Sequence, residues 1–157
     1  MHKVYLGIGS NLGDRQLNID KAIKALEADQ NITLIAISSF LEYQAENRPD
    51  ESSFLNGVVK ILTTYAPLDL LKKVEEIEQE LGRRFKGAYL RRSIDIDLLL
   101  YDEEIVLEDA LTIPHPLMHE RIFVVEPLNE IAPEAYHPIF SKNIATVYRA
   151  IKEGRDL

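Results

Sequence analysis

The chain contains no cysteine and no tryptophan among its 157 residues. The absence of cysteine excludes disulfide bonds, thiolate zinc sites and cysteine nucleophiles. Its longest apolar runs are far shorter than the roughly 20 residues that cross a bilayer. No signal-peptide core precedes the alternating pattern at the N-terminus. We therefore expect a cytoplasmic protein with no membrane partner.

Positive charge is also scarce, because 18 Lys and Arg residues face 26 Asp and Glu residues, a net charge of −8. This balance argues against broad nucleic-acid binding, which needs a basic surface. At about 150 residues per domain, the length predicts one domain over residues 1–157. We expect it to act on small molecules, as a monomer.

The hydrophobic pattern predicts an α+β fold. Apolar residues at helical spacing follow the potential N-cap Asp14, and again from Pro67, a residue typical of a first helical turn, to a stop at Gly82. Strand-like segments are residues 4–8, 32–43, 54–65 and 93–101. The order βαββαβ is typical of a ferredoxin-like core with a largely antiparallel sheet. A C-terminal extension follows, with a hairpin at 105–113, a mixed segment to Pro133 and a short helix over 143–152.

An acidic pair, Asp95 and Asp97, lies in the last of these strands. Alternation places both carboxylates on one face, with Leu99 and Tyr101, and places Ile94, Ile96, Leu98 and Leu100 on the other. Neighbouring carboxylates repel each other when partly desolvated, and Mg²⁺ relieves this while also binding phosphate. A solvated strand face paired with arginine is the alternative.

Five of the chain's cations lie in residues 83–92, directly before the acidic pair, and no acid interrupts them. Guanidinium groups bind phosphate oxygens, so the loop and the acidic pair together favour phosphoryl chemistry on a magnesium–nucleotide complex. Alone, the loop could equally balance the acidic surface. Gly7-Ile8-Gly9 lies within a strand and lacks the third glycine of a dinucleotide-binding fingerprint, so we assign it no ligand.

Three further features have two interpretations each. His115, fixed between Pro114 and Pro116, either contacts phosphate or packs as an ordinary histidine. Phe54 with Asn56, and Arg121 with Phe123, are each two residues apart, so on extended segments each pair shares a face. Such rings and amides suit a flat heteroaromatic ligand, although plain core packing is the commoner role.

With these residues in view, the chain resembles the 6-hydroxymethyl-7,8-dihydropterin pyrophosphokinases of folate biosynthesis, over about residues 4–150. The resemblance rests on motifs in order: Gly9-Ser10-Asn11-Leu12-Gly13-Asp14, Phe54-Leu55-Asn56, Leu81-Gly82-Arg83, Arg92-Ser93-Ile94-Asp95-Ile96-Asp97, Pro114-His115, Arg121-x-Phe123 and Pro127-Leu128-x-Glu130-Ile131-Ala132-Pro133. It implies an enzyme that transfers pyrophosphate from ATP to the pterin hydroxymethyl group and releases AMP.

The resemblance also implies roles for individual residues. Asp95 and Asp97 would hold two Mg²⁺ ions, and Arg83 and Arg92 would be the catalytic loop arginines. The implied ATP site comprises Glu75, Glu78, Arg83, Arg92, Leu98, Thr112, His115 and Arg121. The implied pterin site comprises Tyr43, Phe54, Asn56, Asp95 and Phe123, with the two phenylalanines stacked on either side of the pterin.

The sequence departs from the family pattern in two places. Tyr43-Gln44-Ala45 stands where Thr and Pro are usual, and the 83–92 loop lacks the usual tryptophan. Two other functions stay open from the residues alone. One is a magnesium-dependent phosphohydrolase that uses the same acidic pair, and the other is a non-catalytic ferredoxin-like ligand-binding module.

Overall fold

The computed structural model describes residues 1–44, 53–82 and 93–157, and it is built on a five-stranded sheet. The strands are β1 (His2–Ser10), β2 (Ile32–Ile37), β3 (Leu41–Tyr43), β4 (Phe54–Thr63) and β5 (Asp95–Tyr101). Their order is β2-β4-β1-β5, with β3 also paired to β4, and every pairing is antiparallel. This confirms the predicted antiparallel α+β fold.

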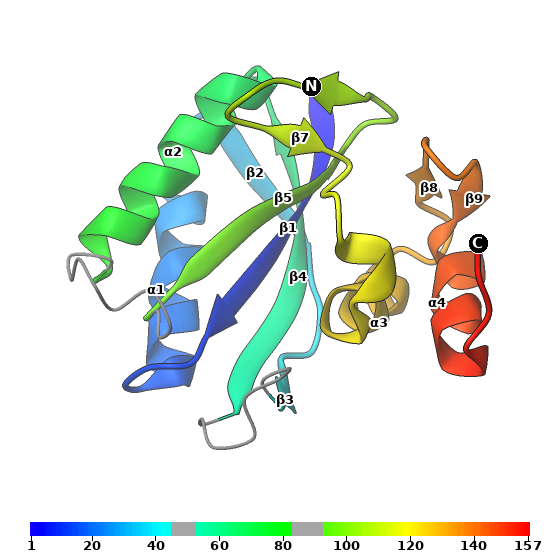
Figure 1. The fold of residues 1–157 in the computed structure, drawn as a ribbon. Helices are drawn as coiled ribbons and strands as arrows, with labels where there is room; N and C mark the ends of the chain where they lie inside the picture. Colours follow the sequence, from blue (N-terminus) through cyan, green and yellow to red (C-terminus); the bar gives the residue numbers. More distant parts are fainter. Residues whose placement is uncertain (45–52, 83–92) are drawn as a thin grey trace.

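Two helices cover one face of the sheet, α1 (Arg15–Glu27) and α2 (Pro67–Glu80), as Figure 1 shows. Asp14 caps α1 by accepting a hydrogen bond from Leu17 N, and Pro67 opens α2, so both predicted helix starts are confirmed. Alternate residues of β1, Val4, Leu6 and Ile8, point into the core beneath these helices and are fully buried.

The opposite face is covered by α3 (Ile122–Ile131) and α4 (Ile144–Glu153). The smaller elements are the hairpin β6 (Val106–Leu107) and β7 (Thr112–Ile113), the 3₁₀ turn η1 (Met118–Glu120), and the pair β8 (Tyr136–His137) and β9 (Lys142–Asn143). The predicted hairpin and C-terminal helix are therefore confirmed. No helix in the described parts of the chain is long and apolar enough to cross a membrane.

Three predictions about local structure were wrong. The expected strand 32–43 is broken into β2 and β3, because residues 38–40 are not in a strand. Ser38 N still donates to Val58 O of β4, but Phe40 packs over Gly57, where a Cβ would lie only 2.7 Å from the ring. The extended segment expected through Arg121 and Phe123 is not formed: Arg121 has an extended backbone as the N-cap of α3, but Phe123 lies in the first turn of that helix. The third wrong prediction is the face of the sheet assigned to Leu100 and Tyr101 in β5.

The alternation of β5 changes at a bulge. Tyr5 pairs with Leu100 but Leu6 pairs with Leu98, so Leu99 has no partner of its own. Leu100 therefore packs with the α3–α4 core, and Tyr101 turns towards the α1–α2 core, the reverse of the prediction. Asp95 and Asp97 precede the bulge and keep their shared face.

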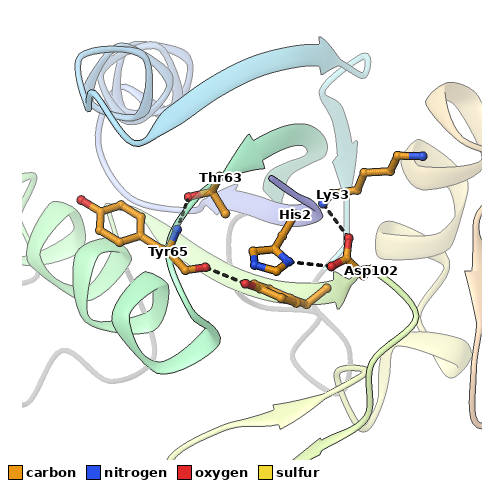
Figure 2. A network of polar contacts seen from close by, with 6 residues as sticks. His2, Lys3, Thr63, Tyr65 and Asp102 are labelled. Atoms are coloured by element: carbon orange, nitrogen blue, oxygen red, sulfur yellow. Dashed lines mark hydrogen bonds and ion pairs between the residues drawn. The ribbon is translucent and has the colours of Figure 1, made fainter.

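A network of polar contacts closes the end of the sheet where β1 begins and β5 ends (Figure 2). Both carboxylate oxygens of Asp102 are engaged, one at 2.8 Å from His2 Nδ1 and the other accepting from Lys3 N at 2.8 Å. Tyr101 donates its hydroxyl to the backbone oxygen of Tyr65 at 2.6 Å. These contacts join β1, β5 and the β4–α2 turn.

Candidate active site

The acidic pair faces two glycines across the central strand. Asp95 is the direct partner of Gly9, and Asp97 is the direct partner of Gly7. Directly paired residues share a face of the sheet, and glycine contributes no side chain to that face. The carboxylates therefore overlook an open floor on the α3 side of β1, near the end of the strand.

This floor is the base of a cavity of about 360 Å³. Its remaining walls come from the end of β1, the start of β4 and the start of α3. The lining residues are Gly7, Gly9, Ser10, Asn11, Phe54, Asn56, Asp95, Asp97, Arg121, Phe123 and Val124. The cavity thus has carboxylates at one side and aromatic rings at the other, which suits a ligand with a charged end and a flat end.

Asn56 lies between the two ends. It pairs with Gly9 on the side opposite Asp95, so Asn56, Gly9 and Asp95 form one row across three strands. Its amide Nδ2 donates to the backbone oxygen of Phe123 at 2.8 Å. Its Oδ1 lies over Gly9, only 2.3 Å from where a Cβ would be, so no other residue fits at position 9 without displacing the amide.

The aromatic side of the cavity consists of Phe54 and Phe123, supported by Tyr43. The rings of Phe54 and Phe123 meet edge to face, with centroids 5.0 Å apart and planes at 87°. Stacking a flat ligand on both sides needs nearly parallel rings about 7 Å apart, twice a normal contact distance. The two phenylalanines must therefore rotate and separate before they can enclose a planar ring.

A cationic group and an imidazole lie beside the acidic pair. The Arg121 guanidinium carbon is 5.5 Å from the centroid of the Phe123 ring, over which it stacks. Burial and the positive charge of Arg121 lower the pKa of His115, against a smaller opposing effect of Asp95, so the ring is neutral at pH 7. Its Nδ1 accepts from Leu117 N at 3.3 Å, which leaves the proton on Nε2 as a donor.

Of the residues singled out in the sequence, six line the cavity: Phe54, Asn56, Asp95, Asp97, Arg121 and Phe123. His115 and Tyr43 adjoin it without lining it.

The other implied nucleotide residues lie apart from this cavity. Glu78 is buried and accepts from Ile96 N at 2.9 Å, and Leu98 is 4% exposed within the α1–α2 core. Thr112 is in β7, and Glu75 is exposed on α2. Arg83 and Arg92 are outside the described residues.

Sequence reasoning gave no ligand role to five lining residues, although three of them, Gly9, Ser10 and Asn11, belong to a motif on which the resemblance rests. The five are Gly7, Gly9, Ser10, Asn11 and Val124. The Gly7-Ile8-Gly9 pattern was compared only with the dinucleotide-binding fingerprint, which it does not match. The signal that could have found it is the alternation itself. Both glycines fall on one face of a strand, and a strand interior normally avoids glycine unless another group approaches closely.

Comparison with known proteins gives a consistent result. The family model for 7,8-dihydro-6-hydroxymethylpterin-pyrophosphokinase matches residues 5–133. The chain is 42% identical over 142 residues to the 2-amino-4-hydroxy-6-hydroxymethyldihydropteridine pyrophosphokinase of Aquifex aeolicus, covering 90% of this chain and 88% of that one. It is 37% identical over 130 residues to the enzyme of the same name from Bacillus subtilis, covering 83% of this chain and 78% of that one.

Solved structures agree on the fold. A crystal structure of HPPK-DHPS in complex with substrates matches 98% of this chain with a TM-score of 0.77 at 15% identity. Plasmodium falciparum wild-type HPPK-DHPS with pteroate matches 97% with a TM-score of 0.74 at 16% identity. The chain spans only 46% and 45% of those two longer proteins. At such identities the likeness concerns the fold alone.

Proposed function

The chain belongs to the 7,8-dihydro-6-hydroxymethylpterin-pyrophosphokinase family, and we propose that the cavity beside β1 is the place where its reaction occurs. The enzyme transfers pyrophosphate from ATP to the hydroxymethyl group of 6-hydroxymethyl-7,8-dihydropterin in folate synthesis. In this reaction the hydroxymethyl oxygen forms a bond to the β-phosphorus and its proton passes to solvent. The bond between the β-phosphorus and the oxygen that bridges the α- and β-phosphates breaks, and AMP leaves with that oxygen. We infer that residues 1–157 act as one catalytic domain.

We assign the pterin to the aromatic end of the cavity. Phe54 and Phe123 would stack on its two faces once their edge-to-face contact opens. The Oδ1 of Asn56, whose amide nitrogen is already committed to the Phe123 backbone oxygen, would accept a hydrogen bond from the pterin edge. This arrangement directs the hydroxymethyl group along the Asn56–Gly9–Asp95 row.

We assign the polyphosphate to the acidic end. Asp95 and Asp97 fit the oxygen ligands that Mg²⁺ prefers, and the absence of side chains at Gly7 and Gly9 leaves room beside them. When bound, Mg²⁺ neutralises charge on the phosphate oxygens. The Arg121 guanidinium and the Nε2–H of neutral His115 would bind and orient those oxygens. Arg83 and Arg92 remain proposed catalytic residues outside the described part of the chain.

The single observation that supports this assignment is the row Asn56–Gly9–Asp95. In this row the amide proposed to bind the pterin edge and the carboxylate proposed to bind Mg²⁺ lie on either side of a residue without a side chain. Adjacent strands are about 4.8 Å apart, so the backbones of Asn56 and Asp95 are separated by roughly 10 Å. Phosphoryl-type transfer needs alignment and charge neutralisation more than covalent help from the protein. A cavity that fixes both substrates along one row supplies that alignment.

One assay separates this function from the two alternatives. The protein is incubated with ATP, Mg²⁺ and 6-hydroxymethyl-7,8-dihydropterin, and the products are separated. AMP in equal amount to pterin diphosphate is expected. ADP or free phosphate without pterin consumption would identify a phosphohydrolase instead, and no turnover would leave a ligand-binding module. Monomeric state and cytoplasmic location stay predictions.

A further inference from the structure

Helix α3 is tied to the segment that leads into β3 by two acidic side chains one helical turn apart. Glu130 accepts from Ser39 N at 2.9 Å with one carboxylate oxygen and from Ser39 Oγ at 2.8 Å with the other. Glu126 accepts from the Tyr43 hydroxyl at 2.8 Å. Residues spaced by four lie on one side of a helix, so the segment runs alongside α3 (Figure 1).

Tyr43 stands behind the two rings that line the cavity. It is the direct partner of Phe54 across the β3–β4 ladder. Its ring centroid is 6.0 Å from that of Phe54 and 6.2 Å from that of Phe123, yet Tyr43 does not line the cavity itself. It therefore contacts both phenylalanines from outside the cavity, at nearly equal distances from the two rings.

The hydroxyl of Tyr43 keeps its proton and donates a hydrogen bond to Glu126. Burial raises its pKa well above the usual value, and the hydrogen bond and negative charge of Glu126 raise it further. The second oxygen of Glu126 is 3.4 Å from the hydroxyl of Tyr148 in α4, a weaker contact. Glu126 thus holds Tyr43 with a short hydrogen bond and connects it loosely to the C-terminal helix.

We propose that Glu126 is a positioning residue for the pterin site: it fixes the Tyr43 ring as a support against which Phe54 and Phe123 take up their ligand-stacking positions. This inference rests on the proposed pterin site. Neither residue touches the substrate in this arrangement, and their effect passes through the two phenylalanines. Tyr43 lies in the Tyr43-Gln44-Ala45 segment, where the sequence departs from the Thr and Pro that are usual in the family.

The physical reason is the entropy of the rings. Without the Glu126 hydrogen bond the Tyr43 side chain can leave its rotamer, and Phe54 and Phe123 then lose the surface that limits their motion. Ordering all three rings would have to occur on ligand binding, which weakens affinity for the pterin. The phosphate end of the cavity does not depend on Tyr43, so nucleotide affinity should be unaffected.

The test measures pterin affinity in Tyr43→Phe, which keeps the ring and removes the hydroxyl, and in Glu126→Ala and Glu126→Gln. Pterin fluorescence reports binding directly, because the chain has no tryptophan. Binding is measured with Mg²⁺ and an ATP analogue whose α,β-bridge cannot be cleaved. Ser39→Ala is the matched control, since it removes a hydroxyl contact to the same helix away from the rings.

We expect the pterin Kd to rise about tenfold in Tyr43→Phe and Glu126→Ala, the size of one lost hydrogen bond to a charged group. The KM for ATP should stay within about twofold in both variants. Glu126→Gln keeps an acceptor oxygen and should restore most of the affinity, and Ser39→Ala should match wild type. Combining Tyr43→Phe with Glu126→Ala should cost no more than either change alone.

Two results would overturn the proposal. One is an unchanged pterin Kd in folded Tyr43→Phe and Glu126→Ala. The other is a loss of pterin and ATP affinity in equal proportion, which indicates general structural damage. The wild-type enzyme is assayed in parallel. Its failure to convert pterin to the diphosphate would refute the proposed function itself, whereas normal wild-type turnover with unaffected variants would refute only the role of Glu126.

Discussion

Replacing Gly9 with alanine should damage the site without touching any charged group. Gly9 is the middle residue of the row that joins Asn56 to Asp95. A Cβ built on Gly9 lies 2.3 Å from Asn56 Oδ1, which is closer than real Cβ contacts come, and 3.5 Å from Leu55 O. The amide must move, and its 2.8 Å hydrogen bond to the Phe123 backbone oxygen is then lost or distorted.

Two effects of Gly9→Ala lower the stability, and a third partly offsets them. Overpacking a well-filled position costs about 1–3 kcal/mol. Leaving a mostly buried amide or carbonyl without its partner costs about 1–3 kcal/mol more. Alanine in a strand gains roughly 0.5–1 kcal/mol over glycine because the unfolded chain is less flexible. The net prediction is a free energy of unfolding lower by about 1–5 kcal/mol.

Gly7 provides the matched control on the same face of the same strand. A Cβ at Gly7 would meet the Leu99 side chain at 3.6 Å, an ordinary contact. Gly7→Ala should therefore change stability by less than about 1 kcal/mol in either direction. Urea denaturation followed by circular dichroism measures both variants. Equal stability of Gly9→Ala and Gly7→Ala would contradict the steric argument.

A double variant isolates the clash itself. Truncating Asn56 to alanine removes the atom that a Cβ at position 9 would meet. In the Asn56→Ala background, adding Gly9→Ala should therefore cost little further stability, a coupling of about 1–3 kcal/mol in the double-mutant cycle. The KM for the pterin should rise in each single variant, because both lose the correctly placed amide. Additive stability losses would mean that Gly9 acts through some other contact.

Three further predictions concern charge and metal. Asp97→Asn should lower turnover about 100-fold with little change in pterin Kd, whereas Asp95→Asn, in the row with Asn56, should affect both; product assays and pterin titrations check this. Burial, followed by the charge of His119, lowers the pKa of His137 to about 4. Between about pH 6.5 and 4 the unfolded chain then binds more protons than the folded chain, so the free energy of unfolding falls by up to about 3 kcal/mol as the pH is lowered through this range. His137→Leu should not show this pH-dependent loss when urea denaturation is measured across the same range. Chelation of Mg²⁺ with EDTA should abolish AMP formation, and added Mg²⁺ should restore it; full activity in EDTA would refute a metal role for the acidic pair.

Local chemistry made most of the fold predictable. Asp14 and Pro67 mark helix starts whose physical causes act within one turn, and both predictions were confirmed. Helix α3 was not predicted, because most of its residues are apolar and Pro127 lies inside it. Such a segment gives no clear helical period, and only its burial against β4 and α4 decides its conformation.

In β5, the assumption that successive side chains alternate between the two faces of the sheet holds for only part of the strand. Alternation correctly placed Asp95 and Asp97 on one face, since they lie before the bulge at Leu99. Beyond it the prediction for Leu100 and Tyr101 was reversed. A bulge is set by pairing with the neighbouring strand, and the sequence of one strand alone does not contain it.

The candidate site illustrates a different limit, because Gly7 and Gly9 of its central strand line the cavity without contributing a side chain. Sequence reasoning looks for residues that can donate, accept or bind metal, and it therefore found Asp95, Asp97 and Asn56 but not Gly9. Asp95 and Asn56 lie on strands that are not paired with each other, and β1 between them brings the two residues into one row. A side chain on Gly9 would displace the Asn56 amide, whose Oδ1 lies 2.3 Å from the position of a Cβ there. In this site the missing atoms of one residue determine whether the chemistry of the others can be used.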